Sequence, residues 1–371
     1  GLAGAPMMRV LAVNAGSSTL KLRVISGDDH VEASLDLDPW DGTVEQDGLA
    51  AWLHDHGAVD AVGHRIVHGG DRYTGPVRID AEVLAGIAGL TSLAPLHQPR
   101  ALAAIEAVRA QGPDAPAVAC FDTAFHAGMP GAATTYALPA AWRHRWPLRR
   151  FGFHGLSHAW ASRRAAALLN RPVEDLRLVT CHLGAGASLC AVLAGRSVDT
   201  TMGFTALEGL VMATRSGSVD PGLLLWLLQV GGLDVDEVAT GLEHHAGLAG
   251  LVGGSGDMRD VVAGVAGGDA GARLGFDVYV HRLRREVAAM VAALGGLDAL
   301  VFTGGVGEHQ PIVRAEAVAG LGFLGLALDA GANAAAQGDA DVSAPGHRAR
   351  TMVVTAREDL EIARSVRQAL A

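Results

Sequence analysis

Residues 10–24 read VLAVNAGSSTLKLRV. An apolar stretch at 10–13 leads into the polar segment 14–19, and a second stretch of alternating residues follows at 20–24. Two such stretches around a short polar segment with a glycine predict a β-hairpin. The tip offers a glycine, two serine hydroxyls, the Asn14 amide and, just beyond, the Lys21 ammonium. Backbone N–H groups next to a glycine, hydroxyls and an amine are the groups that bind phosphate oxygens.

The hairpin tip is not a P-loop, because the G-x-x-x-x-G-K-[ST] spacing and the following helix are absent. A plain polar turn explains the segment equally well when it is read alone. Lys21 favours the phosphate-binding interpretation, because it is the only lysine in the chain.

The composition indicates two domains, since 371 residues exceed the usual size of one core and half of them are apolar. A formal net charge of −10 argues against a nucleic-acid partner. The sequence has neither a secretory signal pattern nor an apolar run of membrane length, so we expect a soluble cytoplasmic protein with no membrane partner. Cys120, Cys181 and Cys190 lack metal-ligand spacing and are expected to be buried thiols.

Charged side chains stand at strand ends in the first half. Arg65 lies in GHRIVHGG, where a planar guanidinium suits a carboxylate or phosphate, although a structural salt bridge is the alternative. Asp122 ends the apolar strand 116–121, a position typical of metal and phosphate sites, with a turn-capping aspartate as the alternative.

Two histidines lie close to predicted helices. His154 precedes a helix expected at 159–169, where a helix N-terminus would favour an anion, and helix capping is the alternative. His97 lies in the proline-bounded loop LAPLHQP. Taken alone, a histidine in such a loop is more often structural than catalytic.

The second half repeats the pattern of the first hairpin. A strand at 176–183 enters the glycine-rich turn 184–186, and another strand leaves it. Two such hairpins predict a nucleotide held between related domains. Arg215 lies in a loop of small residues, and a strand at 299–302 ends in a glycine turn where a flat base could lie on the backbone.

Nine segments, in order, resemble the acetate kinase family, which is grouped with sugar kinases, actin and the heat-shock chaperone ATPases. They are NAGSSTLKLRV, GHRIVHGG, LAPLHQP, FDTAFH, RRFGFHGLSH, HLGAGASL, TMGFTALEGLVMATRSGSVDP, SGDMRD and FTGGVGEH. The resemblance covers nearly the whole chain from Met8. It implies an α/β fold of two ribonuclease-H-like domains with a nucleotide cleft between them. The N-terminal domain is expected at 8–152, with the C-terminal helix at about 359–371 packing back on it, and the nucleotide-binding domain at 153–358.

The activity that the resemblance implies is reversible, direct in-line phosphoryl transfer from ATP to acetate, giving ADP and acetyl phosphate. Mg²⁺ is the implied metal, with Mn²⁺ as a substitute, and the implied assembly is a homodimer. Propionate or another short-chain carboxylate is the alternative acceptor. Such chemistry asks the protein mainly for positioning and positive charge.

The resemblance also assigns roles by position in the motifs. The catalytic residues would be Asp122, Arg65, Arg215, His154 and His97. The acceptor would be bound by Arg65, Val67, Leu96, Phe153 and Ala206. The nucleotide would be bound by Ser17, Ser18, Lys21, His182, Gly184, Gly186, Asp257, Arg259, Gly304, Gly305, Gly307 and His309. Asn14 and Glu358 would order the metal, directly or through water.

Some positions depart from the family pattern. At position 206 the chain has alanine where the family usually has proline. The missing ring leaves room for about one methylene of the acceptor, and one methylene changes the discrimination between two acceptors by about 1–3 kcal/mol. We therefore expect better use of propionate than usual, with Val67 keeping acetate first. Ala185, Gln98 and His309 replace usual asparagines, Ser218 replaces a common aspartate, and the segment around Glu358 also differs.

Three other functions are alternatives to the kinase. A metal-dependent hydrolase would use the histidine pairs 64/68 and 154/158 with Asp122 and His126, but both pairs flank predicted glycine turns and so should not share one helix face. A dinucleotide oxidoreductase needs a G-x-G-x-x-G turn before a helix, and the glycine turns of this chain do not fit that pattern. A non-catalytic ATP-driven switch would not need two arginines and a histidine around a carboxylate-sized pocket.

Overall fold

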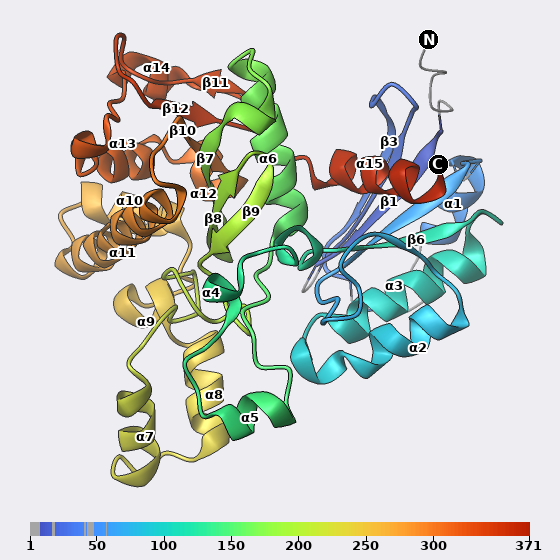
Figure 1. The fold of residues 1–371 in the computed structure, drawn as a ribbon, viewed down its shortest axis with the longest axis horizontal. Helices are drawn as coiled ribbons and strands as arrows, with labels where there is room; N and C mark the ends of the chain where they lie inside the picture. Colours follow the sequence, from blue (N-terminus) through green and yellow to red (C-terminus); the bar gives the residue numbers. More distant parts are fainter. Residues whose placement is uncertain (1–7, 17–18, 41, 43–47, 57) are drawn as a thin grey trace. The chain divides into compact units, whose positions relative to one another are not determined.

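The computed structural model describes residues 8–16, 19–40, 42, 48–56 and 58–371. Its contacts divide the chain into two compact units. The first unit contains Gly1–Ala127, Phe153–Trp160 and Arg357–Ala371, and the second contains Gly128–Gly152 and Ala161–Ala356. Each unit is built around one six-stranded sheet (Figure 1).

The sheet of the first unit has the order β3-β2-β1-β4-β6-β5. Its strands are β1 (Val10–Ala15), β2 (Leu20–Ile25), β3 (Val31–Leu37), β4 (Ala61–Ile66), β5 (Val77–Arg78) and β6 (Ala117–Phe121). The predicted hairpin is confirmed, since β1 and β2 pair antiparallel with Asn14 opposite Lys21. β1, β4 and β6 run parallel, so their carboxyl ends meet at one edge. The helices are α1 (Leu49–His56), α2 (Ala81–Gly89), α3 (Gln98–Gln111) and α15 (Glu358–Leu370).

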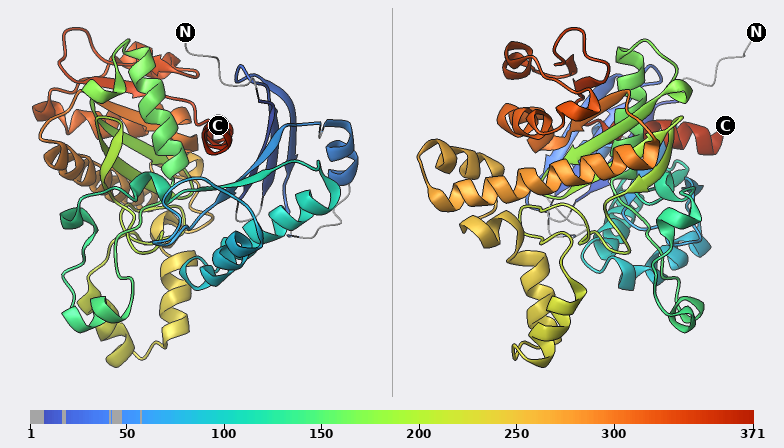
Figure 2. Two further views of the ribbon diagram at one scale, coloured as in Figure 1. Left: turned by 45° about the vertical axis from the view of Figure 1, so that its right-hand side comes forward. Right: turned by 60° about the vertical axis from the view of Figure 1, so that its left-hand side comes forward.

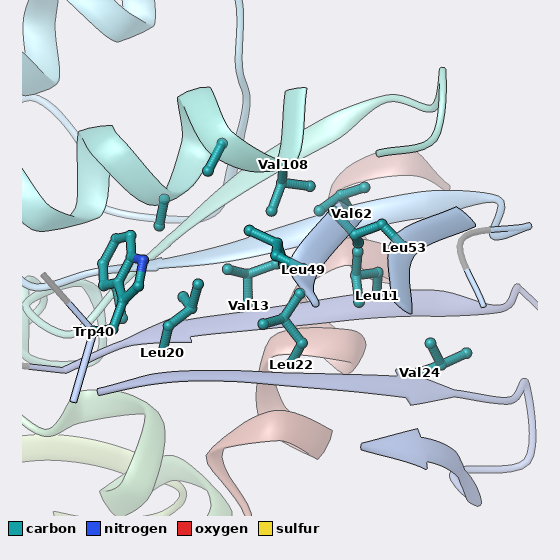
Figure 3. Packing of buried hydrophobic residues seen from close by; sticks show 13 residues of the cluster. Leu11, Val13, Leu20, Leu22, Val24, Trp40, Leu49, Leu53, Val62 and Val108 are labelled. Carbon is teal, nitrogen blue, oxygen red and sulfur yellow. The ribbon is translucent and has the colours of Figure 1, made fainter. Parts of the chain in front are cut away.

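Alternation along the strands gives this sheet two buried faces. One face packs against α1 and α3, and Figure 3 shows Val13, Leu20 and Leu22 of the sheet beside Leu49 of α1. The other face packs against α15, the C-terminal helix. This close approach requires a glycine at position 63, because a Cβ there would overlap the side chains of α15.

The sheet of the second unit has the order β11-β12-β10-β7-β8-β9. Its strands are β7 (Arg177–Leu183), β8 (Ala187–Leu193), β9 (Arg196–Thr200), β10 (Ala299–Thr303), β11 (Ala340–Asp341) and β12 (Arg350–Val353). An antiparallel hairpin with a third antiparallel strand, followed by two parallel strands, occurs in both sheets in the same chain order. The two sheets are therefore topological repeats, as the paired hairpins predicted.

The remaining helices belong to the second unit, α6 only from Ala161 onward. They are α4 (Gly131–Thr134), α5 (Ala140–Arg145), α6 (Gly155–Leu168), α7 (Pro221–Gln229), α8 (Val235–His244), α9 (Gly247–Val252), α10 (Met258–Ala266), α11 (Ala270–Leu294), α12 (Gly304–His309), α13 (Pro311–Ala319) and α14 (Ala330–Ala335). The long helix α11 crosses β7, β8 and β9, as the right-hand view of Figure 2 shows. Its buried stripe includes Phe276, Leu283 and Val287.

The division between the units differs from the expected boundary after residue 152. Residues 128–152 belong with the second unit because Tyr136 and Arg150 both bond to Glu208, each at 2.6 Å. Residues 153–160 belong with the first because the Gly155 N–H donates to the Asp122 carbonyl at 3.0 Å and Leu156 packs in the α15 core. The polypeptide passes from the first unit to the second within α6, a crossing that local sequence does not reveal.

The three cysteines are buried free thiols, as predicted. Among the helices in the described part of the chain, none is both long enough and apolar enough to cross a membrane.

Candidate active site

Four polar side chains gather in the first unit where β1, β4 and β6 end. Asp122 follows β6 and is completely buried, while Arg65 comes from β4. The Arg65 guanidinium donates from Nε to both Asp122 oxygens, at 3.2 and 3.1 Å, and from Nη2 to Oδ2 at 2.6 Å. Its Nη1 donates to Asn14 Oδ1 at 3.1 Å. Asn14 Nδ2 in turn donates to Glu358 Oε2 at 2.8 Å, so one connected network joins three strands to the start of α15.

Burial and opposite charge act against each other in this network. Burial raises the pKa of Asp122 and the Glu358 carboxylate adds to the rise, while Arg65 opposes it. Burial alone would lower the pKa of Arg65, but the carboxylates of Asp122 and Glu358 outweigh it and raise that pKa overall. The guanidinium is therefore a fixed cation, with Asp122 and Asn14 setting its orientation.

The hairpin places Lys21 beside this network. Asn14 and Lys21 are direct partners across the antiparallel pair, so their side chains leave the same face of the sheet. Lys21 is exposed, and an anion near Asn14 would therefore meet a second cation. Ser17 and Ser18, the two serines predicted to bind phosphate, lie outside the described residues.

The loop that carries Asp122 also holds the segment around His154. Gly155 N–H donates to the Asp122 carbonyl at 3.0 Å, and His126 Nε2 bonds to the Phe153 carbonyl at 3.0 Å. Between these anchors His154 has a φ of 56°, a left-handed conformation that costs energy for a residue with a side chain. Hydrogen bonds on both sides of His154 maintain this conformation, and such strain is typical of functional sites.

His126 was not predicted to have a role in the kinase site. It is fully buried, and burial lowers its pKa to about 4, so the ring that bonds to Phe153 is neutral. Its ring also contacts the buried His158 ring, with 5.8 Å between centroids. The FDTAFH spacing contained the signal, because His126 is four residues after Asp122 on the same loop.

The expected position of the histidines relative to α6 was wrong. The helix begins at Gly155 rather than at 159, so His158 lies inside it, and the His158 N–H donates to the His154 carbonyl at 2.9 Å. In the described part of the chain, no three His, Cys, Asp or Glu side chains form a group that could hold a metal ion.

The residues expected around the acceptor differ in exposure. Val67 and Phe153 are buried, and the Phe153 ring meets the His68 ring with 5.5 Å between centroids. Leu96 is 47% exposed, and His97 directly precedes α3. Gln98, at a position where the family usually has asparagine, is buried and donates to the His68 carbonyl at 2.9 Å. It therefore holds the loop that carries Val67.

Because three of its histidines are buried, we expect the folded protein to lose stability in acid. Burial lowers the pKa to about 3 for His64 and to about 4 for His68 and His126, whereas unfolded histidines titrate near 6.5. The unfolded chain therefore binds up to three more protons below pH 6.5, and the free energy of unfolding falls there by up to about 4 kcal/mol per pH unit.

Urea unfolding between pH 7.5 and 5 measures this slope. The variant His126→Gln should reduce it by about 1.4 kcal/mol per pH unit, and His347→Gln, at an exposed site, should leave it unchanged. A stability that stays constant from pH 6.5 to 5 would contradict the neutral buried state of these rings.

Arg215 lies in the second unit, in a loop without regular structure. Its Nη1 donates to the Ala206 carbonyl at 3.3 Å and lies 3.9 Å from Met212 Sδ. No carboxylate of a described residue forms an ion pair with it, and burial lowers its pKa. A partly buried guanidinium with unused donors suits a phosphate or carboxylate ligand.

A cavity of about 420 Å³ in the second unit brings together part of the predicted nucleotide site. Predicted residues that line it are Gly184, Asp257, Arg259, Gly305 and His309. Asp257 begins α10, and the hydrogen bond from Arg259 lowers its pKa. Arg259 is highly exposed and paired with Asp257, so both remain accessible to a ligand.

Other predicted nucleotide residues lie next to this cavity in the chain without lining it. They are His182, Gly186, Gly304 and Gly307. Gly186 accepts a hydrogen bond from the Gly184 N–H at 3.0 Å and so shapes the turn. Gly304 has a φ of 79°, and a Cβ there would lie 2.8 Å from the Leu183 carbonyl oxygen. These glycines let the two strand ends approach each other.

Residues 304–309 form the short helix α12 rather than the predicted glycine turn. Glu308 explains the difference, because its carboxylate accepts from the Gly304 N–H at 2.9 Å and closes the first turn. The same oxygen accepts from Ala356 N–H at 3.0 Å. Neither Glu308 nor Tyr279, which lines the cavity with a buried hydroxyl, was predicted.

Asn14 and Glu358 suit a magnesium ion in the chemistry of their donors. Each offers a hard oxygen, but Asn14 Oδ1 and Glu358 Oε2 already bond within the network. Mg²⁺ keeps several waters and usually takes one or two carboxylates together with phosphate oxygens. These residues therefore fit a metal held mainly through water and substrate.

A family model described as "Acetokinase family" matches residues 43–364. The acetate kinase of Synechococcus sp. is 50% identical over 316 residues, which cover 85% of this chain and 78% of that protein. The structure of Porphyromonas gingivalis acetate kinase aligns with a TM-score of 0.87 at 32% identity, covering 98% of this chain and 100% of the other. A propionate kinase from Francisella tularensis aligns with a TM-score of 0.88 at 33% identity, covering 97% and 99%.

Proposed function

Because this chain belongs to the acetokinase family, we propose that it transfers the terminal phosphoryl group of ATP reversibly to acetate, giving ADP and acetyl phosphate. One observation carries the assignment of the acceptor site: the partly buried Arg65 guanidinium, oriented by Asp122 and Asn14, two residues before the buried apolar residue Val67. A fixed planar cation beside an apolar surface suits a small carboxylate.

Arg65 binds and orients the acetate carboxylate so that one oxygen faces the phosphorus atom. This oxygen forms the new O–P bond while the bond to the ADP oxygen breaks, and no covalent enzyme intermediate is needed. Asp122 keeps the guanidinium in place and supplies the negative charge that offsets it. The Arg65 network thus contributes by positioning the acetate, and positioning is the main demand of phosphoryl transfer.

Charge on the transferring group is stabilised by Arg215 and His154. Arg215 is supported in this role by its unused donors, and His154 by its strained backbone and its anchors to the Asp122 loop. Lys21 adds a further cation beside Asn14. Asn14 and Glu358 would hold a magnesium ion, directly or through water, and the ion would neutralise charge on the ATP phosphates.

The nucleotide occupies the cavity lined by Gly184, Asp257, Arg259, Gly305 and His309. The volume of about 420 Å³ lies in the usual range for small-molecule sites. Ala185 lines it with a methyl group where the family usually has asparagine, so one side-chain contact to the nucleotide is replaced by apolar surface.

The acceptor range includes propionate, although acetate is preferred. Val67 limits the pocket, and Ala206 at the expected proline position leaves room for one methylene. Ala206 belongs to the second unit, and its carbonyl bonds to Arg215, which supports a place near the reacting groups.

The variant Ala206→Pro is expected to lower the propionate-to-acetate ratio of kcat/KM by about 10-fold or more, since one methylene is worth about 1–3 kcal/mol. Steady-state kinetics with both acceptors measure the ratio. Ala206→Gly adds no ring and should leave the ratio the same or higher. Equal ratios in all three proteins would show that position 206 does not determine acceptor size.

The protein assembles as a homodimer through the second unit. Exposed apolar side chains gather on α7 and the segment leading to α8, and we call them the α7–α8 surface. They are Leu223, Leu225, Trp226, Val230, Leu233 and Val235, with exposed fractions between 37% and 70%. Apolar surface of this extent marks a site of protein association.

Trp226→Glu is expected to convert the dimer to a monomer, because an aromatic side chain at an apolar interface contributes strongly and a buried carboxylate is costly. Light scattering after size-exclusion chromatography measures the mass. Phe323→Glu, at a 76% exposed apolar site elsewhere in the second unit, should remain dimeric. A dimeric Trp226→Glu protein would place the interface elsewhere.

Hydroxylamine trapping tests the proposed activity and its acceptor. The protein is incubated with ATP, magnesium and hydroxylamine, and with acetate, propionate, butyrate or no acceptor. Acyl hydroxamate should form fastest with acetate, more slowly with propionate and not without an acceptor. ATP hydrolysis without any hydroxamate would contradict the kinase and favour a switch-type ATPase.

A further inference from the structure

A second cavity in the first unit, of about 570 Å³, lies on the opposite side of β4 from the Arg65 network. Successive residues of β4 point to opposite faces. Gly63 meets α15, whereas Val62 packs with Val108 of α3. His64 therefore faces α3, and it lines this cavity.

His64 is a buried side chain with one ring nitrogen that is unpaired among the described residues. Its side chain is 3% exposed, and its Nδ1 has no hydrogen-bond partner among the described residues. An unsatisfied buried polar group destabilises a protein, so its presence requires an explanation. Since His64 lines the cavity, a ligand bound there would lie against this side chain.

Two arginines lie around the same cavity. Arg78 of β5 and Arg109 of α3 both line it, both are exposed, and neither pairs with a carboxylate of a described residue. Asp114 also lines the cavity, so the formal charge of these three groups is positive. The lining also includes the aliphatic side chains of Ile79 and Ile105.

We propose that this cavity binds a small organic anion, a phosphate or carboxylate group on a compact apolar body. Arg78 and Arg109 bind the anionic group, because guanidinium groups bind phosphates and carboxylates through paired hydrogen bonds. The apolar body lies against the aliphatic side chains, and a polar atom of the ligand bonds to His64. The volume is in the normal range for such ligands.

Histidine-labelled protein, studied by NMR in the absence of ATP and acetate, tests the site. The His64 signal is assigned with the variant His64→Gln. The probes are phenyl phosphate, benzoate, inorganic phosphate and the uncharged benzyl alcohol. Phenyl phosphate or benzoate should shift the His64 signal saturably, and the tighter of the two identifies the anionic group. Inorganic phosphate should bind about 10-fold more weakly, since it lacks the apolar body, and benzyl alcohol should have no effect.

The decisive comparison is ligand binding with and without the two arginine charges of the cavity. Arg78→Gln with Arg109→Gln should weaken binding at least 10-fold, as expected for loss of two charged hydrogen-bond donors. Arg72→Gln is the matched control, because Arg72 is an exposed arginine of the same unit, paired with Glu82 outside the cavity, and this variant should bind normally.

No shift of the His64 signal at about 10 mM of any probe, or a shift that survives loss of both arginines, would overturn the proposal. The experiment measures no phosphoryl transfer, so its outcome is independent of the proposed kinase activity.

Discussion

Replacing Asp122 with asparagine is expected to lower kcat for acetate phosphorylation by about 10²–10³-fold, the range for loss of one preorganised electrostatic group. Asp122 receives three of the hydrogen bonds that orient Arg65. An asparagine amide would turn an NH₂ group toward the guanidinium or lose one contact. Arg65 would then bind acetate in more than one orientation, and the attacking oxygen would seldom align with phosphorus.

The same substitution should destabilise the protein by about 3–5 kcal/mol, because it leaves a mostly buried guanidinium without its counter-charge. Denaturant unfolding measures this loss, and kcat is referred to the folded fraction so that the two effects separate. Asp36→Asn is the matched control, since Asp36 pairs with Arg23 at a half-exposed site of the same unit. It should cost at most about 1 kcal/mol and leave kcat unchanged. Near-normal kcat in folded Asp122→Asn would contradict the role of the pair.

Gly155→Ala is expected to lower kcat by about 100-fold through geometry alone, without removing any reactive group. A Cβ at position 155 would overlap the Asp122 carbonyl oxygen and lie 2.9 Å from Phe125 Cβ. The loop or the helix start must therefore move, and the bond from the Gly155 N–H to Asp122 is strained or lost. Asp122 and His154 both depend on this contact, so both would shift.

Kinetics and unfolding of Gly155→Ala measure the effect, with an expected stability loss of about 1–3 kcal/mol for overpacking. Gly89→Ala is the control, because a Cβ there meets nothing within 4 Å and the residue ends α2 of the same unit. It should be neutral or stabilise by up to about 1 kcal/mol. If Gly155→Ala kept full activity, the tight contact between the Asp122 loop and α6 would not be needed for catalysis.

Much of the fold could be predicted from strand patterns. Residues 10–24 predicted the first hairpin, residues 176–189 predicted the second, and both are confirmed. Strand alternation and apolar runs are local properties, so they are readable from sequence. The position of Asp122 at the end of β6 was predicted for the same reason.

The errors arose where side chains determine the backbone at a distance. The start of α6 was placed four residues late, because Gly155 reads as a turn residue and its bond to Asp122 is not local. Residues 304–309 form a helix because the Glu308 carboxylate closes the first turn. The boundary between the units depends on bonds from Tyr136 and Arg150 to Glu208, which are more than fifty residues away in the chain.

Residues that act by holding others were the hardest to predict. His126 and Gln98 bond to the backbone carbonyls of Phe153 and His68. For His126 the one signal in the sequence is its position four residues after Asp122, and Gln98 has no comparable signal. Their importance becomes visible only when tertiary contacts are known. Arg65 and Asp122 were predictable because they lie at strand ends, where parallel strands bring side chains together.

The most direct test of a carboxylate kinase is ³¹P NMR of the protein with ATP, magnesium and acetate. The expected result is loss of the terminal phosphate signal of ATP with the appearance of ADP and acetyl phosphate in equal amounts, and the reverse reaction when ADP and acetyl phosphate are supplied. Release of inorganic phosphate from ATP with no acetyl phosphate at any time would contradict the proposed transfer to acetate.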